Sequence, residues 1–527
     1  MILATKLGIL ATSVALLACL KGYFSRRKLP PGPRGWPVIG NLFDLLPDGQ
    51  HPGEFYARYK ALYGPLSSLT VFGQPIIIVN DRKTAAQLFD KSAKHSSRPQ
   101  SVFADGLCGY GKSIPRQNNT PLLRAYRRAT AQVIGTKSSA AKFDHHLENE
   151  FRRLLWRIQQ DPDGLLDHCR IATGSFVLKI TYGYNVDPHQ KDSLIDLADL
   201  VLKQFSEAIT PGKFLVDLIP ALQHLPEWVP GTGFKKIARF NKETILKLTN
   251  YPFEFTKWQM RHKENKPSFV SESIKHGEDA EITKWAAGAI YGAGTDTTVG
   301  LIEGFFLAMM NFPGVQRKAQ AELDRVIGED RFPSVADRPN LPYIDGVLKE
   351  TMRWHTVAVM TPRKSDEDEV INGYLVPRGA ILMANIWAMN NDPEIYPNPS
   401  DFRPERYLPA EGQEIAPDPH DNTFGFGRRI CPGRITAETS IFLAIVHTLF
   451  AFDIKKPVGE DGNVLESELR PTPEFISHPA PYKCSLTVRS PRREQLMLGF
   501  MREHPFEPSD AGKLQKAVKA VSVLENS

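Results

Sequence analysis

The sequence predicts a mostly helical protein with a minor β-sheet region, and three observations support this fold class. Apolar residues recur at helical spacing over residues 314–328 and 343–355, which places them on one face of each segment. Residues 285–310 form a longer apolar stretch, which is typical of a buried helix. Residues 66–79 instead carry apolar residues around Gly73, which predicts a hairpin of two short strands, and residues 370–385 carry alternating apolar residues about the turn at residues 377–379.

The length and composition of the chain predict one large domain over residues 41–490. A chain of 527 residues can bury a large core, and no internal repeat or low-complexity tract divides this part of it. The 65 basic and 59 acidic residues give a net charge of +6, which is too balanced for a nucleic-acid-binding surface. The five cysteines lie far apart, which argues against a disulfide framework or a zinc site and favours a reducing compartment. We therefore expect no nucleic-acid partner.

The N-terminal residues 1–24 predict a membrane anchor. Residues 7–20 carry no charge, and the apolar run extends to residue 24 if Lys21 reaches the membrane surface. A cleaved signal peptide is the alternative, but no obvious small-residue cleavage site follows. The three cations at residues 26–28 favour a cytosolic flank, so the bulk of the protein is expected in the cytosol. The basic and proline-rich residues 25–40 then form a stiff hinge.

The segment from Phe424 to Gly433 presents a single cysteine on a glycine-rich loop beside a fixed positive charge. Its glycines let the backbone pass close to a flat cofactor, and amides that point at the sulfur favour the thiolate form of Cys431. A lone buried cysteine is usually just a small apolar residue. However, the pattern Phe-x-x-Gly-x-Arg-x-Cys-x-Gly is expected by chance in a chain of this length only about once in ten thousand. Cys431 is therefore predicted to ligate a soft metal.

On this loop the sequence resembles the cytochrome P-450 haem-thiolate monooxygenases, in which the loop carries the axial cysteine. The resemblance covers residues 30 to about 490. It implies the cytochrome P-450 fold, preceded by one N-terminal transmembrane helix, with Cys431 bound to the iron of haem b (iron protoporphyrin IX). It also implies dioxygen as co-substrate and electrons from NADPH through a separate cytochrome P-450 reductase, since the chain has no flavin or nicotinamide fingerprint. The cofactor contacts that it implies on the loop are Phe424, Gly425, Arg429 and Gly433.

Residues 285–310 combine unusual glycines with an acid and an alcohol. The glycines at 288, 292, 294, 300 and 304 each cost about 1 kcal/mol relative to alanine in a helix, and a close helix crossing would explain them. The threonine hydroxyl in this segment can bond a preceding carbonyl and open the helix locally. The segment resembles the family's oxygen-activation motif, which implies that Thr297 organises protons at dioxygen and Asp296 relays them. Ala293 and Gly294 would then line the cofactor.

Three further residues resemble the Glu-Arg-Arg triad that braces the haem-side core of the family. Glu350 and Arg353 lie three residues apart and share one helix face, and Arg406 follows in a Pro-Glu-Arg segment. An ion pair at this spacing by itself supports only a solvated helix face. The resemblance implies a structural role, so that loss of one partner would prevent haem retention.

Arg124 and Arg127 occupy the place of the family's Trp-Arg-x-x-Arg helix, whose side chains meet a haem propionate, but Leu123 replaces the tryptophan. Propionate anchoring would then fall to Arg124, Arg127 and Arg429 through charge-assisted hydrogen bonds, with Arg363 as another contact. An exposed basic helix is the alternative interpretation of residues 124–128.

Two other regions are less informative about function. Residues 205–230 are apolar and turn-rich, and either roof the substrate and touch the membrane, as in the family, or form an ordinary core loop. Residues 354–364 lack two prolines that are common in the family, so the substrate is least predictable from relatives there. We expect residues 491–527 to form a flexible C-terminal extension.

Together these features predict a haem-thiolate monooxygenase in the endoplasmic reticulum membrane, with a single-pass anchor and a cytosolic catalytic domain. Its expected partners are the reductase, membrane lipid and a hydrophobic small molecule, into which it inserts one oxygen atom. Residues 211–214 and 478–484 look like fungal members that oxidise secondary metabolites of terpenoid, polyketide or alkaloid type, such as the O-methylsterigmatocystin oxidoreductase group. The alternatives are a haem-thiolate isomerase or dehydratase without a reductase, and a non-catalytic haem sensor. Asp296 and Thr297 argue against both.

Overall fold

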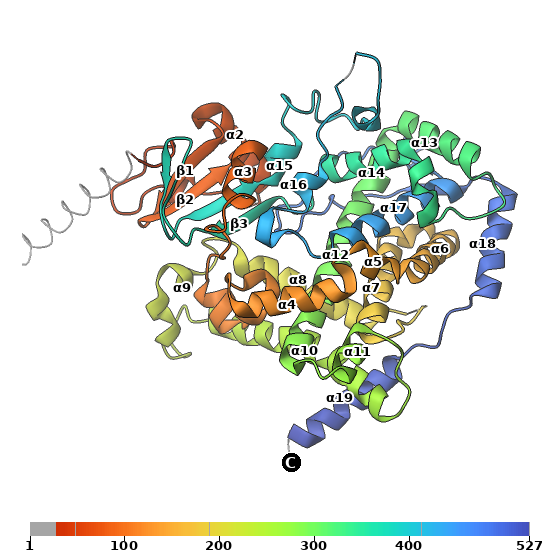
Figure 1. Cartoon of the computed structure of the whole chain (residues 1–527), viewed down its shortest axis with the longest axis horizontal. Helices are drawn as coiled ribbons and strands as arrows, with labels where there is room; N and C mark the ends of the chain where they lie inside the picture. The colour runs from red at the N-terminus through yellow and green to blue at the C-terminus, as the bar shows by residue number, and fades with distance from the viewer. Residues whose placement is uncertain (1–27, 48, 189, 413, 526–527) are drawn as a thin grey trace, which may run out of the picture. The chain divides into compact units, whose positions relative to one another are not determined.

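A computed structural model describes residues 28–47, 49–188, 190–412 and 414–525 (Figure 1). The chain divides into two compact units. The first, here called the sheet unit, comprises Met1–Pro99, Ala358–Asp392 and Phe424–Ile430. The second, the helical unit, comprises Gln100–Val357, Pro393–Thr423 and Cys431–Ser527. The predicted anchor at residues 1–24 and the first three residues of the predicted hinge lie outside the described residues.

The sheet unit is built on strands β1 (Leu66–Val71), β2 (Gln74–Val79), β6 (Ile381–Asn385) and β3 (Met360–Lys364), which lie side by side in this order. β1 and β2 form the antiparallel hairpin predicted over residues 66–79, with Leu66 opposite Val79. β6 pairs parallel with β2 and antiparallel with β3. The α-helices in the described part of this unit are α2 (Pro52–Tyr63), α3 (Arg82–Phe89) and α15 (Ile386–Asn390). The predicted hairpin is confirmed.

The strand pattern at residues 370–385 resolves differently from the prediction, which centred it on the turn at residues 377–379. β4 (Glu369–Ile371) and β5 (Tyr374–Val376) form their own hairpin, while β6 leaves to join the larger sheet. The hairpin turns at Asn372 and Gly373, whose φ angles are 51° and 81°. A two-residue hairpin turn of this kind needs positive φ at both positions, which Asn and Gly tolerate and Pro377 cannot adopt. The predicted pairing about residues 377–379 was therefore wrong.

The core of the sheet unit lies between the sheet and helix α3. Ile77 and Val79 of β2 and Leu382 and Ala384 of β6 are fully buried and pack with Leu88 and Phe89 of α3. Phe426, from the loop segment Phe424–Ile430, belongs to the same cluster, and its ring lies 5.9 Å from that of Phe89. The loop that precedes Cys431 is thus held by an apolar contact to the sheet unit.

The helical unit contains the remaining helices, and the predicted mostly helical fold class is confirmed. The segments predicted as helices at residues 285–310, 314–328 and 343–355 form α12, α13 and α14. The elements of the unit are α4 (Pro121–Ile134), α5 (Lys137–Ala141), α6 (Asp144–Gln160), α7 (Leu165–Tyr182), α8 (Ser193–Ile209), α9 (Leu215–Leu218), α10 (Phe234–Arg261), α11 (Phe269–Lys275), α12 (Ala280–Asn311), α13 (Pro313–Val326), α14 (Pro342–Trp354), α16 (His420–Thr423), α17 (Arg434–Ala451), α18 (Pro491–Glu503) and α19 (Ala511–Glu525), with strands β7 (Phe452–Lys455) and β8 (Ser485–Val488).

Helix α12 is the central element of the helical unit. It packs against α4, α7, α8, α10, α14 and α17, and Figure 1 shows it passing among them. Most of its residues are buried, so its stability comes from tertiary packing on several sides. Its first turn is capped by Asp279, whose carboxylate accepts a 2.8 Å hydrogen bond from the Ile282 N–H.

Close packing explains most of the glycines in α12. A Cβ added at Gly304 would lie 2.8 Å from Cβ of the buried His355, and one at Gly288 would lie 2.8 Å from Cγ2 of Thr249. At Gly300 and Gly294 the nearest side-chain atoms would be 3.2 Å and 3.1 Å away, on Val357 and Val177. At Gly292 no atom lies within 4 Å. The interpretation as a close helix crossing therefore holds for Gly288 against α10 and Gly294 against α7, whereas Gly300 and Gly304 pack against the chain that follows α14 and Gly292 has no such contact.

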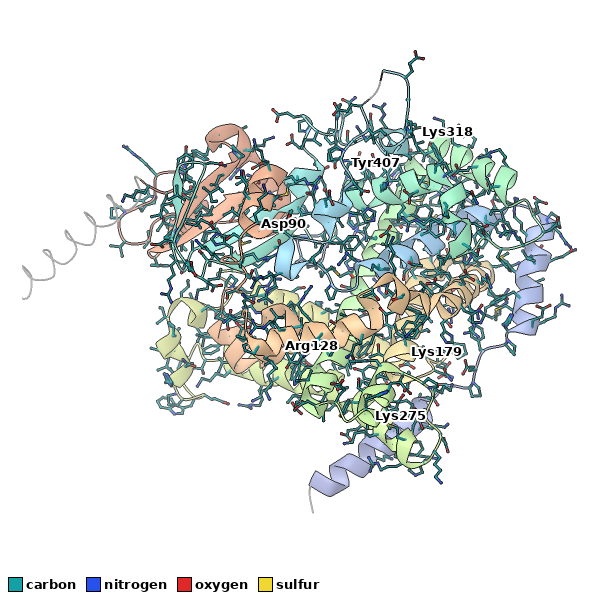
Figure 2. The ribbon with its side chains drawn as sticks, viewed as in Figure 1. Asp90, Arg128, Lys179, Lys275, Lys318 and Tyr407 are labelled. Carbon is teal, nitrogen blue, oxygen red and sulfur yellow. The ribbon has the colours of Figure 1, made fainter. Side chains whose placement is uncertain are left out.

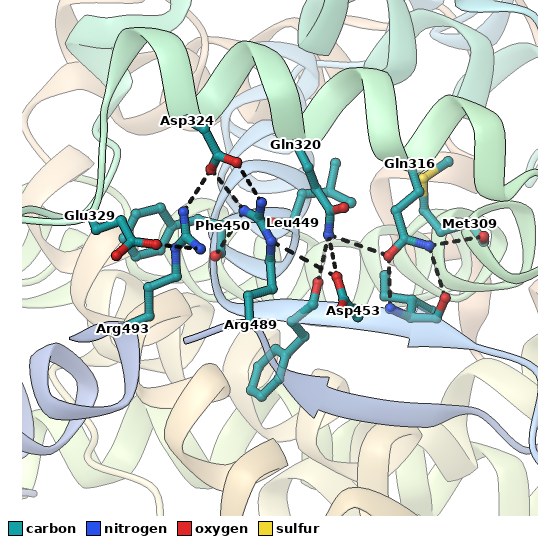
Figure 3. Close-up of polar contacts among 12 residues, drawn as sticks. Met309, Gln316, Gln320, Asp324, Glu329, Leu449, Phe450, Asp453, Arg489 and Arg493 are labelled. Atoms are coloured by element: carbon teal, nitrogen blue, oxygen red, sulfur yellow. Dashed lines mark hydrogen bonds and ion pairs between the residues drawn. The ribbon is translucent and has the colours of Figure 1, made fainter. Parts of the chain in front are cut away.

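The C-terminal extension forms helices α18 and α19, where the sequence predicted a flexible tail. Figure 3 shows Arg493 of α18 buried between acids of the helical unit, with Nη2 2.6 Å from Asp324 and Nη1 3.0 Å from Glu329. Arg489 forms a second ion pair with Asp324, 2.7 Å long. Further along, Glu507 pairs with Lys179, which Figure 2 labels, and with Lys266. These partners are distant in the sequence, so the sequence of residues 491–527 by itself could not reveal them.

One described helix, α17, is long and apolar enough to cross a membrane. About two thirds of it (67%) is buried inside the protein, which is typical of a core helix. Helices α12 and α13 pass the same test together, but the chain bends by 105° between them.

We predict that Gly304→Ala destabilises the protein by about 1–3 kcal/mol, because the added methyl group overpacks against His355. Gly499→Ala, in α18 with no atom within 4 Å of the added Cβ, is the matched control. It should raise stability by about 0.5–1 kcal/mol through helix propensity. Chemical unfolding followed by circular dichroism measures both. Equal effects of the two substitutions would contradict the packing explanation.

Candidate functional site

Cys431 lies in the helical unit, directly before α17. The residue as a whole is partly exposed, and its sulfur accepts a hydrogen bond from the backbone N–H of Gly433. Burial raises the pKa of the Cys431 thiol, and this N–H together with the guanidinium groups of Arg127 and Arg434 opposes the rise. Gly433 also leaves space beside the sulfur, because a Cβ there would lie 4.0 Å from Sγ. The predicted amide contact and positive surroundings are therefore both present.

The loop residues before Cys431 belong to the sheet unit, where Gly427 sets their path. Gly427 has a φ of 49°, and a Cβ at this position would lie 2.0 Å from the backbone oxygen of Phe89. Its N–H donates a 2.6 Å hydrogen bond to Asp90, which Figure 2 labels. Only glycine fits this close approach. Gly427 was not among the cofactor contacts predicted from the sequence, although its place in the glycine-rich motif was the available signal.

Two predicted cofactor contacts, Arg363 and Arg429, also lie in the sheet unit and brace its segments. Arg363 is 2% exposed and donates from Nη2 to the Phe426 oxygen over 2.9 Å. Arg429 donates from Nε to the Ser96 oxygen over 2.7 Å. Phe424 and Gly425 lie in the same loop, and Gly425 has no atom within 4 Å of an added Cβ.

Helix α4 places one of its arginines near the sulfur. Arg127 is partly buried and interacts electrostatically with Cys431, while burial lowers the pKa of its guanidinium group. Arg124 and Arg128 are exposed, and Figure 2 labels Arg128 on this helix. Leu123, which stands where the family has tryptophan, is 3% exposed and faces the core. Of this basic segment, Arg127 is thus the residue that the structure places beside Cys431.

The middle of α12 is open where the rest of the helix is buried. Ala293 is exposed, and Gly294, Asp296 and Thr297 are partly exposed. The Thr297 hydroxyl donates a 2.8 Å hydrogen bond to the Ala293 carbonyl, as expected for a threonine that loosens the helix. An exposed alanine at the centre of a buried helix leaves an apolar surface that a flat group can cover. With a thiol ligand and the Arg127 cation in the same unit, the donor set of the helical unit fits a haem.

The ion pairs that His478 forms with Asp296 and with Glu303 were not anticipated from the sequence. His478 Nε2 lies 3.1 Å from Asp296 Oδ1, and His478 Nδ1 lies 2.8 Å from Glu303 Oε2. The sequence showed the acids only as members of a long helix and His478 only as part of a fungal-like segment. Their spatial proximity needed the tertiary structure.

The predicted triad is assembled around the buried carboxylate of Glu350. Arg353 donates to it twice, over 2.8 Å from Nε and from Nη2, and Arg406 donates from Nε over 3.2 Å. The Tyr407 hydroxyl and the Arg403 N–H add hydrogen bonds of 3.0 Å and 2.8 Å. Glu350 and Arg353 have no solvent exposure, so the alternative of a solvated helix face is excluded. Figure 2 labels Tyr407 in this region.

We predict that Glu350→Ala lowers the stability of the helical unit by about 3–5 kcal/mol, because it leaves Arg353 as a buried charge without its counter-ion. Soluble protein and its haem content should both fall, as measured by absorbance of the purified protein. Glu243→Gln removes a surface i,i+4 pair with Lys247 and is the matched control. Its effect should be below about 0.5 kcal/mol. A soluble, haem-containing Glu350→Ala protein of unchanged stability would contradict the structural role.

Comparisons with known proteins agree with this geometry. The cytochrome P450 family model matches residues 30–486. Cytochrome P450 monooxygenase claR of Ampulloclitocybe clavipes is 43% identical over 97% of this chain and 97% of its own length. Cytochrome P450 monooxygenase ppsD of Aspergillus oryzae is 41% identical over 95% and 98%, and O-methylsterigmatocystin oxidoreductase of Aspergillus flavus is 36% identical over 93% and 94%. Because the family match and these relatives span nearly the whole chain, it belongs to the cytochrome P450 family.

Proposed function

We propose that this monooxygenase inserts one oxygen atom from dioxygen into a hydrophobic small molecule of fungal secondary metabolism, with Cys431 as the thiolate ligand of haem b. The observation that carries the proposal is the environment of the sulfur, which combines the Gly433 N–H with the Arg127 and Arg434 cations. These groups oppose the rise in the pKa of the thiol that burial causes, and thiolate is the form that binds iron. Bound haem supplies the site at which dioxygen is reduced, with electrons from NADPH through a separate reductase.

The remaining cofactor contacts divide by chemistry. Arg124, Arg127, Arg363 and Arg429 offer guanidinium groups that can hold propionates through charge-assisted hydrogen bonds. Ala293, Gly294, Phe424, Gly425 and Gly433 offer apolar or open surface against a flat ring. Gly433 also orients the sulfur, since its N–H bonds the sulfur while its missing side chain leaves space there.

Thr297 and Asp296 handle protons in this proposal. The Thr297 hydroxyl donates its hydrogen bond to the Ala293 carbonyl. The lone pairs of its oxygen therefore remain free to accept a hydrogen bond from water or from a reduced oxygen species. Asp296 is the neighbouring acid that passes protons towards this position. An alcohol that orients the acceptor and an acid that resupplies protons together direct dioxygen reduction towards water and product.

The membrane assignment belongs to the same proposal. Residues 1–24 would anchor the chain in the endoplasmic reticulum membrane, and residues 25–40 would act as the hinge. The segment at residues 205–230 favours membrane contact over an ordinary core loop, because Leu215, Ile219 and Trp228 are 63%, 53% and 83% exposed. Exposed large apolar side chains in one segment suit a lipid surface.

We expect Cys431→Ala to fold without incorporating haem, because the protein then offers no thiolate to the iron. The measurement is the absorbance spectrum of the reduced protein with carbon monoxide bound, in which the wild type should absorb at about 450 nm. Cys484→Ala is the control, since Cys484 is also partly exposed and lies outside the loop. A Cys431→Ala protein that keeps this absorbance would refute the ligand assignment.

We expect Thr297→Ala to reduce product formation by about 10²-fold while NADPH is still oxidised, because proton delivery is no longer organised. The substrate is first found by screening apolar compounds for a change in the ferric spin state. Thr297→Ser should restore product, and Thr295→Ala should leave coupling unchanged, because the Thr295 hydroxyl makes the same kind of bond to Tyr291 but is buried. If the substrate does not stimulate NADPH oxidation or dioxygen uptake by the wild type, this result would favour the isomerase or the sensor instead.

A further inference from the structure

A histidine from the C-terminal segment bridges two acids on helix α12. Asp296 and Glu303 are seven residues apart and therefore lie on the same face, two turns from each other. His478 reaches both, with Nε2 3.1 Å from Asp296 and Nδ1 2.8 Å from Glu303. The exposed fractions of the His478, Asp296 and Glu303 side chains are 18%, 17% and 3%. Both ring nitrogens therefore face carboxylates in a largely enclosed position.

The surrounding chain holds His478 in this place. The His478 N–H donates to Thr472 Oγ1 over 3.0 Å, and the Ser477 N–H donates to the Val357 oxygen over 2.9 Å. The Tyr482 hydroxyl donates to the Glu303 carbonyl over 2.6 Å. Gly300 lies on the helix face between the two acids, and a Cβ there would meet the Ser477 oxygen at 3.3 Å and His478 Cε1 at 3.5 Å. The glycine thus lets the segment approach the helix closely enough for the bridge.

The geometry of the bridge defines the charge of the ring. Only the imidazolium form donates from both nitrogens, so only this form satisfies both carboxylates at once. Burial acts to lower the pKa of His478, but the hydrogen bonds and charges of Asp296 and Glu303 outweigh it and raise the pKa to about 10. This is above the ordinary value, so the stabilising charge is fully present below about pH 6.5 and is lost as pH rises through about 10.

Two charged groups from other helices face the same cluster. Arg170 of α7 places Nη2 3.4 Å from Glu303 Oε1. Burial raises the pKa of Asp199 on α8 to about 6, while Arg170 and His478 oppose the rise and Asp296 adds to it. Arg170 therefore shares Glu303 with His478, whereas Asp296 depends on the histidine for its direct ion pair.

We propose that His478 is a positioning residue for proton delivery: as an imidazolium held between Asp296 and Glu303, it fixes the position of the Asp296 carboxylate beside Thr297. This inference rests on the proposed role of Asp296. Without the imidazolium, the Asp296 carboxylate loses the hydrogen-bond donor that holds it, and no other direct ion pair of Asp296 is present among the described residues. Asp296 would then lose its fixed position beside Thr297.

The charge of the ring is tested first, without reference to activity. Histidine-selective ring NMR is recorded on the full chain as the reduced carbon monoxide complex, and His478→Gln assigns the signal by its disappearance. We expect His478 to stay protonated from pH 6 to 9 and to titrate at lower pH in Asp296→Asn. His447 is the internal control, because burial lowers its pKa to about 3 and it should stay neutral throughout. A His478 signal that titrates near pH 6.5 would overturn the proposal.

Proton delivery is tested next by substrate-free turnover with the reductase, in which NADPH, a proton and dioxygen give NADP⁺ and hydrogen peroxide. We expect His478→Gln to slow NADPH oxidation roughly 10-fold and to increase its solvent deuterium isotope effect. His478→Lys keeps a cation and should restore most of the rate, whereas His447→Gln should match the wild type. Haem content is measured for every variant, and rates are expressed per haem.

The outcomes distinguish a failure of this inference from a failure of the proposed proton relay through Asp296, on which it rests. If Asp296→Asn slows turnover and raises the isotope effect but His478→Gln changes neither, the positioning role is refuted while the role of Asp296 stands. If Asp296→Asn itself has no effect, the proposed relay fails and the inference fails with it. If His478→Lys is as slow as His478→Gln, the ring acts by shape and not by charge, which also overturns the proposal.

Discussion

Helix α12 has to be buried along most of its length and still present polar chemistry at one short stretch, and the helical unit is organised around this constraint. Gly300 and Gly304 let the chain at residues 355–357 approach one face of the helix closely. The turn at Ala293–Thr297 begins seven residues before Gly300 and is partly exposed, and in it the Thr297 hydroxyl is bonded to the Ala293 carbonyl. Tight packing at one end of the helix therefore supports an open site in its middle.

Two buried carboxylates of the helical unit, those of Glu350 and Glu303, are tolerated because donors or opposite charges surround them. Glu350 is fully buried and accepts hydrogen bonds from two arginine side chains, a tyrosine and a backbone amide. Glu303 is nearly as buried and is balanced by His478 and Arg170. The first arrangement is closed and braces α14, whereas the second reaches the partly exposed Asp296. A closed cluster suits a structural role, and an open one suits proton transfer.

The cysteine loop joins two different kinds of environment. Up to Ile430 it is held by the sheet unit, through the Phe426 ring and the close approach of Gly427 to Phe89. From Cys431 onward it belongs to the helical unit and leads into α17, with the Gly433 N–H bonded to the sulfur. The glycines of this motif thus differ in function. Gly427 permits a backbone contact, and Gly433 shapes the surroundings of the sulfur.

The sequence by itself determined the mostly helical class, the hairpin at residues 66–79, the helices that became α12 to α14, and the identity of Cys431 as the candidate ligand. These features depend on local periodicity or on a compact motif, which can be read within a few turns of chain. Only the tertiary structure decided the strand pairing of β6, the helices of the C-terminal extension, and the contacts of His478 with Asp296 and Glu303. Each of these depends on partners that are far away in the sequence, and neither periodicity nor spacing encodes which distant side chain will satisfy a buried charge or a strand edge.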